Sequence, residues 1–208
     1  MSKNKFPVKK YRSILDFSLD YSKLISSALQ KNFNQISFAA LEIEKKIKKK
    51  NTIFVCGNGG SSAIANHFVC DYLKGLSTDT NLNPKVISLN AHSELISAIS
   101  NDIGNDEIFS FQASKLVKKN DLIILFSSSG NSNNIKKLLQ FTKKNKIKTI
   151  GFSGFGGGYL KKNSNISIHV DIDNYGITED VFHIYMHIIM QFLKQKNLTI
   201  KKIHKIKF

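Results

Sequence analysis

Apolar residues recur at helical spacing over residues 14–30 and 33–47, and no strand-like segment precedes residue 52. Apolar positions three and four residues apart form one face of a helix, so this pattern predicts that the chain begins with two amphipathic helices. Residues 178–195 show the same period and predict a long helix near the end of the chain.

Between these helices the pattern changes to short apolar runs rich in β-branched residues, which predict strands. The five runs are "TIFVC" (52–56), "KVISL" (85–89), "DLIILFS" (121–127), "KTIGFS" (148–153) and "ISIHV" (166–170). Four of them lack polar–apolar alternation, as expected of strands covered on both faces. Helix-like segments separate the runs, so we expect an α/β fold with an open parallel sheet in three layers.

The 208 residues, 41% of them apolar, are enough for one sizeable core. No repeat, low-complexity linker or proline-rich boundary divides the chain. We therefore expect a single domain over 1–208, with N-terminal helices at about 12–49, an α/β core at about 52–195 and a basic tail at 196–208.

The cellular location is predicted from segments that the sequence lacks. No signal-peptide pattern opens the chain, and no run of about 18 apolar residues occurs, so we expect a cytoplasmic protein with no membrane partner. Cys56 and Cys70 have no CxxC spacing, which predicts small buried residues rather than a disulfide framework or thiolate zinc site.

The charge is strongly positive, with 31 Lys+Arg against 15 Asp+Glu and a formal net charge of +16. Such a balance suits phosphorylated ligands, nucleic acid or anionic surfaces. The lysines cluster at the ends of predicted elements without interleaved aromatic residues, and Arg12 is the only arginine. Nucleic-acid readers favour arginine and stacking aromatics, so we expect solvated lysines and no nucleic-acid partner.

The first unusual corner is "CGNGGSS", which follows the first predicted strand. Gly57, Gly59 and Gly60 permit close backbone approach, and Ser61 offers a hydroxyl at a helix start. The segment is neither a GxGxxG fingerprint nor a P-loop with its lysine, so no nucleotide cofactor is predicted. The alternative is a tight turn in which Ser61 is merely an N-cap.

The second corner is "FSSSGNSNN", which leads from a buried strand into a helix. Hydroxyls and free backbone N–H groups at the positive end of a helix form a cradle for a phosphate monoester. The hydroxyls belong to Ser127, Ser128, Ser129 and Ser132. A plain N-cap with a polar loop is the alternative, and a serine nucleophile would require a GxSxG elbow that is absent.

Four segments, in this order, carry a resemblance to a known family: "CGNGGSSAIANHF", "SNDIGNDEIFS", "SSSGNSNNI" and "NYGITED". Over roughly residues 15–195 the chain resembles the SIS (sugar isomerase) domain family, in its phosphoheptose isomerase branch. The resemblance implies a flavodoxin-like domain with a five-stranded parallel sheet, assembled as a homotetramer with active sites between subunits. It also implies interconversion of sedoheptulose 7-phosphate and D-glycero-D-manno-heptose 7-phosphate for surface-polysaccharide heptose.

The resemblance also implies roles for residues of this chain. It places Asn58, Gly59 and Gly60 against the sugar with Ser61 nearby, and the serine corner against the phosphate. Asn101 and Asp102, from "SNDIGND", fall where the family contacts the open-chain sugar.

The catalytic base implied by the family is a glutamate one helical turn after a histidine, and both bind zinc. Here the pair is His67 and Asp71, which are four residues apart and share one helix face. Aspartate keeps the charge and shortens the reach by one methylene. The alternative is that Asp71 only orients His67.

The last helix departs from the family, which supplies a glutamine and, eight residues later, a histidine as the remaining zinc ligands. An ungapped alignment through "NYGITED" puts Phe182 and Met190 there, so a complete zinc site is not expected. Around the helix axis, His183 points in nearly the same direction as Met190, and Glu179 points between the directions of Phe182 and Met190. Both are therefore candidates for a replacement acid or base. His183 and His187 could equally be ordinary hydrogen-bonded helix residues. The alternative function is a non-catalytic SIS domain that binds or senses sugar phosphates.

Overall fold

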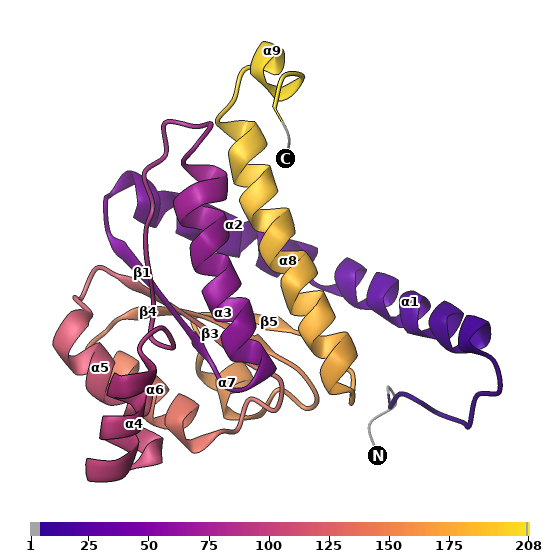
Figure 1. Cartoon of the computed structure of the whole chain (residues 1–208), viewed down its shortest axis with the longest axis horizontal. Helices are drawn as coiled ribbons and strands as arrows, with labels where there is room; N and C mark the ends of the chain where they lie inside the picture. Colours follow the sequence, from indigo (N-terminus) through magenta and orange to yellow (C-terminus); the bar gives the residue numbers. More distant parts are fainter. Residues whose placement is uncertain (1–4, 207) are drawn as a thin grey trace.

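The computed structural model describes residues 5–206 and 208, so residues 1–4 of the predicted domain and Lys207 of the predicted basic tail lie outside the described residues (Figure 1). All five predicted strands form one parallel sheet in the order β2-β1-β3-β4-β5. The strands are β1 Thr52–Gly57, β2 Lys85–Ser88, β3 Leu122–Ser127, β4 Lys148–Ser153 and β5 Ile166–His169.

Helices connect and cover the strands. They are α1 Ile14–Lys31, α2 Phe33–Lys48, α3 Gly60–Cys70, η1 Asp71–Leu76, α4 Ser93–Asp102, η2 Asn105–Glu107, α5 Ile108–Leu116, α6 Asn133–Lys144, α7 Gly158–Asn163, α8 Tyr175–Lys196 and α9 Ile200–Ile203. The three helices predicted from periodicity are confirmed as α1, α2 and α8. Helix α8 begins three residues earlier than predicted because the Asn174 side chain caps it, accepting from the Ile177 N–H at 2.9 Å.

The sheet separates two apolar cores. Alternate residues of β1 face opposite sides: Ile53 and Val55 pack with α2, α3 and α8, whereas Phe54 and Cys56 pack with α4, α5 and α6. Figure 1 shows these two groups of helices on opposite sides of the strands. The expected coverage of both faces is therefore confirmed for the central strands. Strand β2 differs because it is an edge strand, and its Ile87 is exposed.

Helix α1 projects away from the sheet (Figure 1), and among its residues only Ala28 is buried. Phe17 and Tyr21, in the first half of α1, form an aromatic cluster with Phe6 and Tyr11, which precede the helix. The Tyr21 hydroxyl donates to Asp180 Oδ2 at 2.5 Å, which joins α1 to the start of α8.

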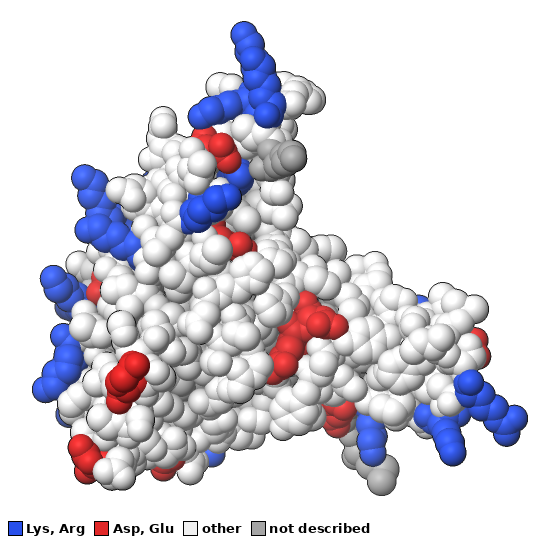
Figure 2. Space-filling model, in the orientation of Figure 1, with Lys and Arg blue, Asp and Glu red and all other residues white. Residues whose placement is uncertain are grey.

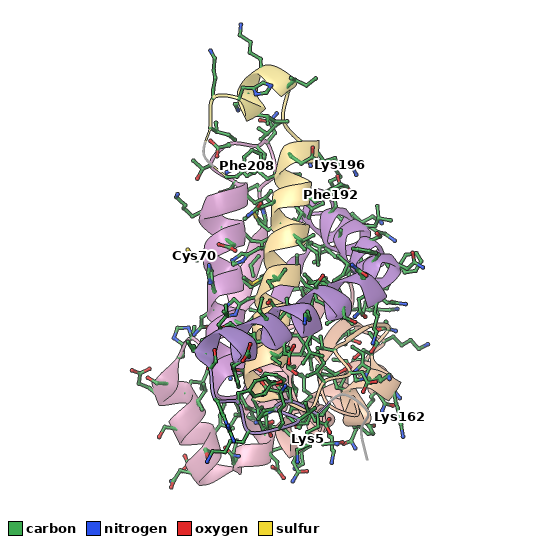
Figure 3. All side chains as sticks on the ribbon, turned by 90° about the vertical axis from the view of Figure 1, so that its right-hand side faces the viewer. Lys5, Cys70, Lys162, Phe192, Lys196 and Phe208 are labelled. Carbon is green, nitrogen blue, oxygen red and sulfur yellow. The ribbon has the colours of Figure 1, made fainter. Side chains whose placement is uncertain are left out.

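The two cysteines differ in environment. Cys56 is buried as predicted, whereas Cys70 is exposed at the end of α3, so the prediction is wrong for Cys70. Figure 3 shows its side chain directed away from α8. Within residues 5–206 and 208, every helix is too short or too polar to cross a membrane.

Candidate functional site

The glycine and serine corners lie side by side because they follow neighbouring strands. Gly57, at the end of β1, pairs with Phe126 near the end of β3. Asn58 and Asn134 then exchange two amide hydrogen bonds, of 2.9 and 3.0 Å, across the gap between the corners. The carboxyl ends of adjacent parallel strands are the usual ligand-binding position of such sheets.

The backbone of the glycine corner is held on both sides. The Asn90 side chain accepts from the Gly57 N–H at 3.0 Å and donates to the Gly57 carbonyl at 2.8 Å. On the other side, a Cβ on Gly60 would lie 2.3 Å from Glu179 Oε2, so a larger residue there would displace the Glu179 carboxyl. The N-cap of α3 is Gly59, and the buried Ser61 side chain hydrogen-bonds Glu179 instead. The N-cap alternative for Ser61 is therefore wrong.

The serine corner combines structural and unpaired hydroxyls. Ser127 Oγ accepts from the Gly130 N–H at 3.2 Å, and Ser129 Oγ accepts from the Asn131 N–H at 3.3 Å. Ser132 is the N-cap residue of α6 but makes no side-chain cap bond. The Ser128 hydroxyl is buried and, in the described chain, has no hydrogen-bond partner. A buried hydroxyl without a partner costs free energy, which indicates a group kept for a ligand.

We therefore expect Ser128→Ala and Ser127→Ala to behave differently. Ser128→Ala should leave the free energy of unfolding within about 0.5 kcal/mol because it removes no internal bond. It should weaken binding of a sugar phosphate about tenfold, the value of one hydrogen bond to a charged group. Ser127→Ala should lower the free energy of unfolding by about 1 kcal/mol. Thermal melts and calorimetric titrations measure both. A large loss of stability in Ser128→Ala with unchanged binding would contradict this reading.

Asn101 and Asp102 end α4 and are exposed, and Asn101 Nδ2 donates to Asp102 Oδ1 at 2.8 Å. Asn101 lines an open hollow of about 650 Å³ with Asn90 and Ser62, so it faces the glycine corner. Asp102 is not among the residues that line this hollow. The structure therefore brings Asn101, but not Asp102, toward the other candidates.

A carboxylate between two imidazoles lies further along α3. Asp71 Oδ1 is 3.3 Å from His67 Nε2, and Asp71 Oδ2 is 3.3 Å from His187 Nε2. Asp71 is the first residue of η1, a π-helical turn that continues α3, and its side chain is 15% exposed. Such turns are common at functional sites. Because Asp71 also meets His187, it does more than orient His67.

The ungapped alignment of α8 is wrong about which residues face α3, because Phe182 and Met190 do not lie beside Asp71. Phe182 is buried against Phe126 and Phe152, with ring centroids 6.3 and 5.7 Å apart, so it belongs to the core. Met190 is also buried and lies near Gly75. His187, rather than Met190, lies beside Asp71. The residue eight positions before His187 is Glu179, so these two residues have the spacing that the family implies for its glutamine and histidine. Sequence reasoning missed this role, although the Glu179–His187 spacing was a usable signal.

His183 and Glu179 lie on the same face of α8. The His183 ring is 5.6 Å from that of His67 and 6.1 Å from that of His187. Burial, and then the neighbouring imidazoles, lower the pKa of His183. Burial raises the pKa of Glu179 against the opposing effect of the Ser61 hydrogen bond. The pair therefore offers a neutral imidazole and a carboxyl that keeps its proton more readily than usual.

The cluster around Asp71 has the composition of a divalent-metal site. Among the described residues, His67, Asp71 and His187 each present one donor atom, and these atoms lie within 4.8 Å of one another. Asp71 Oδ2 is buried and lies 3.3 Å from His187 Nε2, but it makes no hydrogen bond of favourable geometry in the described chain. Two imidazoles and one carboxylate with an open position are a common donor set of catalytic zinc, so these residues fit the ion.

Comparison with known proteins shows the family to which the chain is similar. A family model described as "SIS domain" matches residues 16–154. Phosphoheptose isomerase of Buchnera aphidicola subsp. Schizaphis graminum is 34% identical over 190 residues, covering 89% of this chain and 97% of the relative. A probable phosphoheptose isomerase of Thermoplasma acidophilum is 33% identical over 168 residues, covering 81% and 92%.

Solved structures show the same fold. A phosphoheptose isomerase from Francisella tularensis superposes with a TM-score of 0.79 at 25% identity, covering 88% of this chain and 96% of that one. The enzyme from Neisseria gonorrhoeae gives a TM-score of 0.78 at 22% identity over 88% and 97%. The chain belongs to the SIS domain family, in its phosphoheptose isomerase branch.

Proposed function

We propose that this protein isomerises sedoheptulose 7-phosphate to D-glycero-D-manno-heptose 7-phosphate, for heptose of a surface polysaccharide. Two features together carry the proposal. The loop after β3 holds an unpaired buried hydroxyl at Ser128, and the end of α3 holds a carboxylate at Asp71. The first is suited to a phosphate, and the second is suited to moving a proton. The curated relatives named phosphoheptose isomerase support the same substrate class.

The serine corner would hold the phosphate. Backbone N–H groups at the start of α6 and the hydroxyls of Ser128 and Ser132 can surround a dianion at the positive end of the helix. The open-chain sugar would then extend toward the glycine corner, where Asn58 and Asn101 present amides. Fixing the phosphate supplies binding energy that orients the reacting carbons.

Asp71 would act as the base in this account. It would take a proton from C1 of the ketose, leaving an enediol, and a proton would then be delivered to C2 while the hydroxyl proton of O1 passes to O2. We assign delivery to Glu179, because burial raises its pKa and its carboxyl lies against the glycine corner. His183, whose pKa is lowered, would stay neutral beside His67.

Zinc held by His67, Asp71 and His187 would polarise the carbonyl when bound. His187→Ala should therefore abolish stabilisation by zinc. We expect zinc at about one hundred times its dissociation constant to raise the melting temperature of the unmodified protein by about 5–10 °C. His183→Ala is the matched control and should keep most of this rise, because its donor atoms lie outside the cluster. Equal rises in all three proteins would show that zinc binds elsewhere.

The direct test of the proposal is turnover of sedoheptulose 7-phosphate, compared with sedoheptulose that lacks the phosphate. We expect conversion of the phosphorylated sugar and a large loss of kcat/KM without the phosphate. Thermal stabilisation by the sugar phosphate without any turnover would instead support the non-catalytic binding protein. No response to either sugar would overturn the substrate class.

We further propose a cytoplasmic homotetramer. Exposed apolar side chains on the packed helices α2 and α8 support the assembly: Phe38, Leu41, Ile188 and Phe192 are each 45% exposed or more. Such patches are typical of subunit interfaces. The free cysteines agree with a reducing compartment. Light scattering would give the mass of the assembly, and a monomer at micromolar concentration would contradict this part of the proposal.

A further inference from the structure

The positive charge of the chain is concentrated where three strands begin and where α8 ends. Four segments hold sixteen lysines and three carboxylates, a surplus of thirteen out of the chain's formal charge of +16. The segments are 42–50, 118–121, 143–148 and 194–205. We call the surface that they form the basic edge.

The structure brings these segments together. Strands β1, β3 and β4 are adjacent in the sheet, so the loops that lead into them are neighbours. Lys46 Nζ donates to the Asn120 carbonyl at 2.6 Å, which joins the first two segments directly. Lys196 Nζ donates to Glu44 Oε2 at 2.7 Å, which joins the end of α8 to the end of α2. The basic edge is therefore one surface.

Most lysines of the basic edge are exposed to solvent, apart from the buried Lys194 and the largely buried Lys46, whereas its acids are buried. Glu42, Glu44 and Asp121 are only 8%, 4% and 5% exposed. Both glutamates are paired with lysines, and Asp121 accepts from the Thr52 N–H at 2.9 Å. Figure 2 shows lysines projecting along the upper left margin and at the top of the molecule, with few carboxylates beside them. The exposed charge is thus almost entirely positive.

The C-terminal segment adds apolar side chains to this charge. Ile200 is 75% exposed and Phe208 is 50% exposed, and lysines alternate with them along α9 and the turn after it. The segment is held to the body by Lys202, whose Nζ donates to the Asp79 carbonyl at 2.7 Å. Figure 3 shows Phe208 beside the end of α8. A basic segment with exposed apolar residues is typical of proteins that lie on a membrane surface.

We propose that the basic edge docks on the surface of an anionic lipid bilayer. Lysine neutralises anionic lipid as well as arginine does, whereas nucleic-acid recognition favours arginine, which this edge lacks. Exposed Ile200 and Phe208 serve the interface of a bilayer better than a phosphate backbone. Docking requires no spanning helix, so it is compatible with the helices described above.

Docking at this edge would leave the glycine and serine corners open. The basic edge lies at the amino ends of β1, β3 and β4, and the glycine and serine corners lie at the carboxyl ends of β1 and β3. A six-residue strand separates its two ends by about 20 Å. The bound protein could therefore exchange sugar phosphates with the solution.

The test is co-sedimentation of the full chain with vesicles of phosphatidylcholine alone or with about one-third phosphatidylglycerol. We expect binding to the anionic vesicles only, and release at about 1 M salt, where screening shortens the Debye length to about 3 Å. The triple variant Lys119→Glu, Lys144→Glu, Lys146→Glu should lower the partition coefficient about a hundredfold or more. The matched control Lys10→Glu, Lys23→Glu, Lys31→Glu, on and before α1, should change it less than about threefold.

Circular dichroism checks that the variants fold. If the triple variant does not fold, Lys146→Glu alone replaces it, with an expected loss of about fivefold in the partition coefficient. Turnover of sugar phosphate should be equal in all variants, so the result is independent of the proposed function. Absence of binding to anionic vesicles, equal loss in both triple variants, or preference for duplex DNA over vesicles would overturn the proposal.

Discussion

Asp71→Asn is expected to lower kcat for sedoheptulose 7-phosphate by at least about a thousandfold, while the protein still binds the sugar phosphate. A general base contributes about 10²–10⁴ to the rate, and the amide can neither take the proton nor serve as an anionic ligand beside His67 and His187. Asparagine fills the same volume between the two imidazoles, so the fold should be kept. Steady-state kinetics and calorimetric binding on the same preparation separate the two effects.

The matched control is Asp71→Glu, which keeps the charge and restores the residue implied by the family. It should retain turnover, because the carboxylate is lengthened by one methylene toward an open position of the cluster. If Asp71→Asn turned over sugar phosphate at the normal rate, Asp71 would not be the base. Loss of binding together with turnover would assign Asp71 to the architecture of the site instead.

Gly130→Ala is expected to damage both stability and phosphate binding. Gly130 has φ +64, and a Cβ there would lie 2.1 Å from the Gly157 carbonyl oxygen. The backbone conformation alone costs a residue with a Cβ about 1–3 kcal/mol, and the contact forces the loop before α7 to move. Because Gly130 closes the serine corner, KM for the sugar phosphate should rise at least about tenfold. Denaturant unfolding and steady-state kinetics measure these effects.

Gly156→Ala provides the comparison within the neighbouring loop. A Cβ on Gly156 meets nothing within 4 Å, so Gly156→Ala should change the free energy of unfolding of the protein by less than about 0.5 kcal/mol. Similar behaviour of the two alanine variants would mean that the contact between Gly130 and Gly157 does not hold the serine corner in place.

The elements of the fold could be predicted from the sequence because each is encoded locally. The apolar run of β3 is buried at every position, and the helical period of residues 14–30 and 33–47 is visible without any partner. The two corners were also recognisable, since glycine and serine clusters follow strands whose order fixes their proximity. Their joining through Asn58 and Asn134 depends only on β1 lying beside β3.

The acid–imidazole cluster could not be predicted in the same way. The contact between Asp71 and His187 depends on how α8 is rotated when it packs on α3, and the buried Phe182 and Met190 determine that rotation. An alignment without gaps placed these two apolar residues at the site and His187 away from it. The exposure of Cys70 and the close approach of Glu179 to Gly60 depend on the same helix packing.

If this chain transfers a proton between C1 and C2 of the sugar, deuterium from the solvent enters the product. The protein would be incubated in D₂O with sedoheptulose 7-phosphate, and the aldose product would be examined by NMR and mass spectrometry. We predict deuterium at C2 of the aldose, and none when Asp71→Asn replaces the unmodified protein. Absence of deuterated product from the unmodified protein, with this substrate and with other ketose phosphates, would show that this chain is not an isomerase of ketose phosphates.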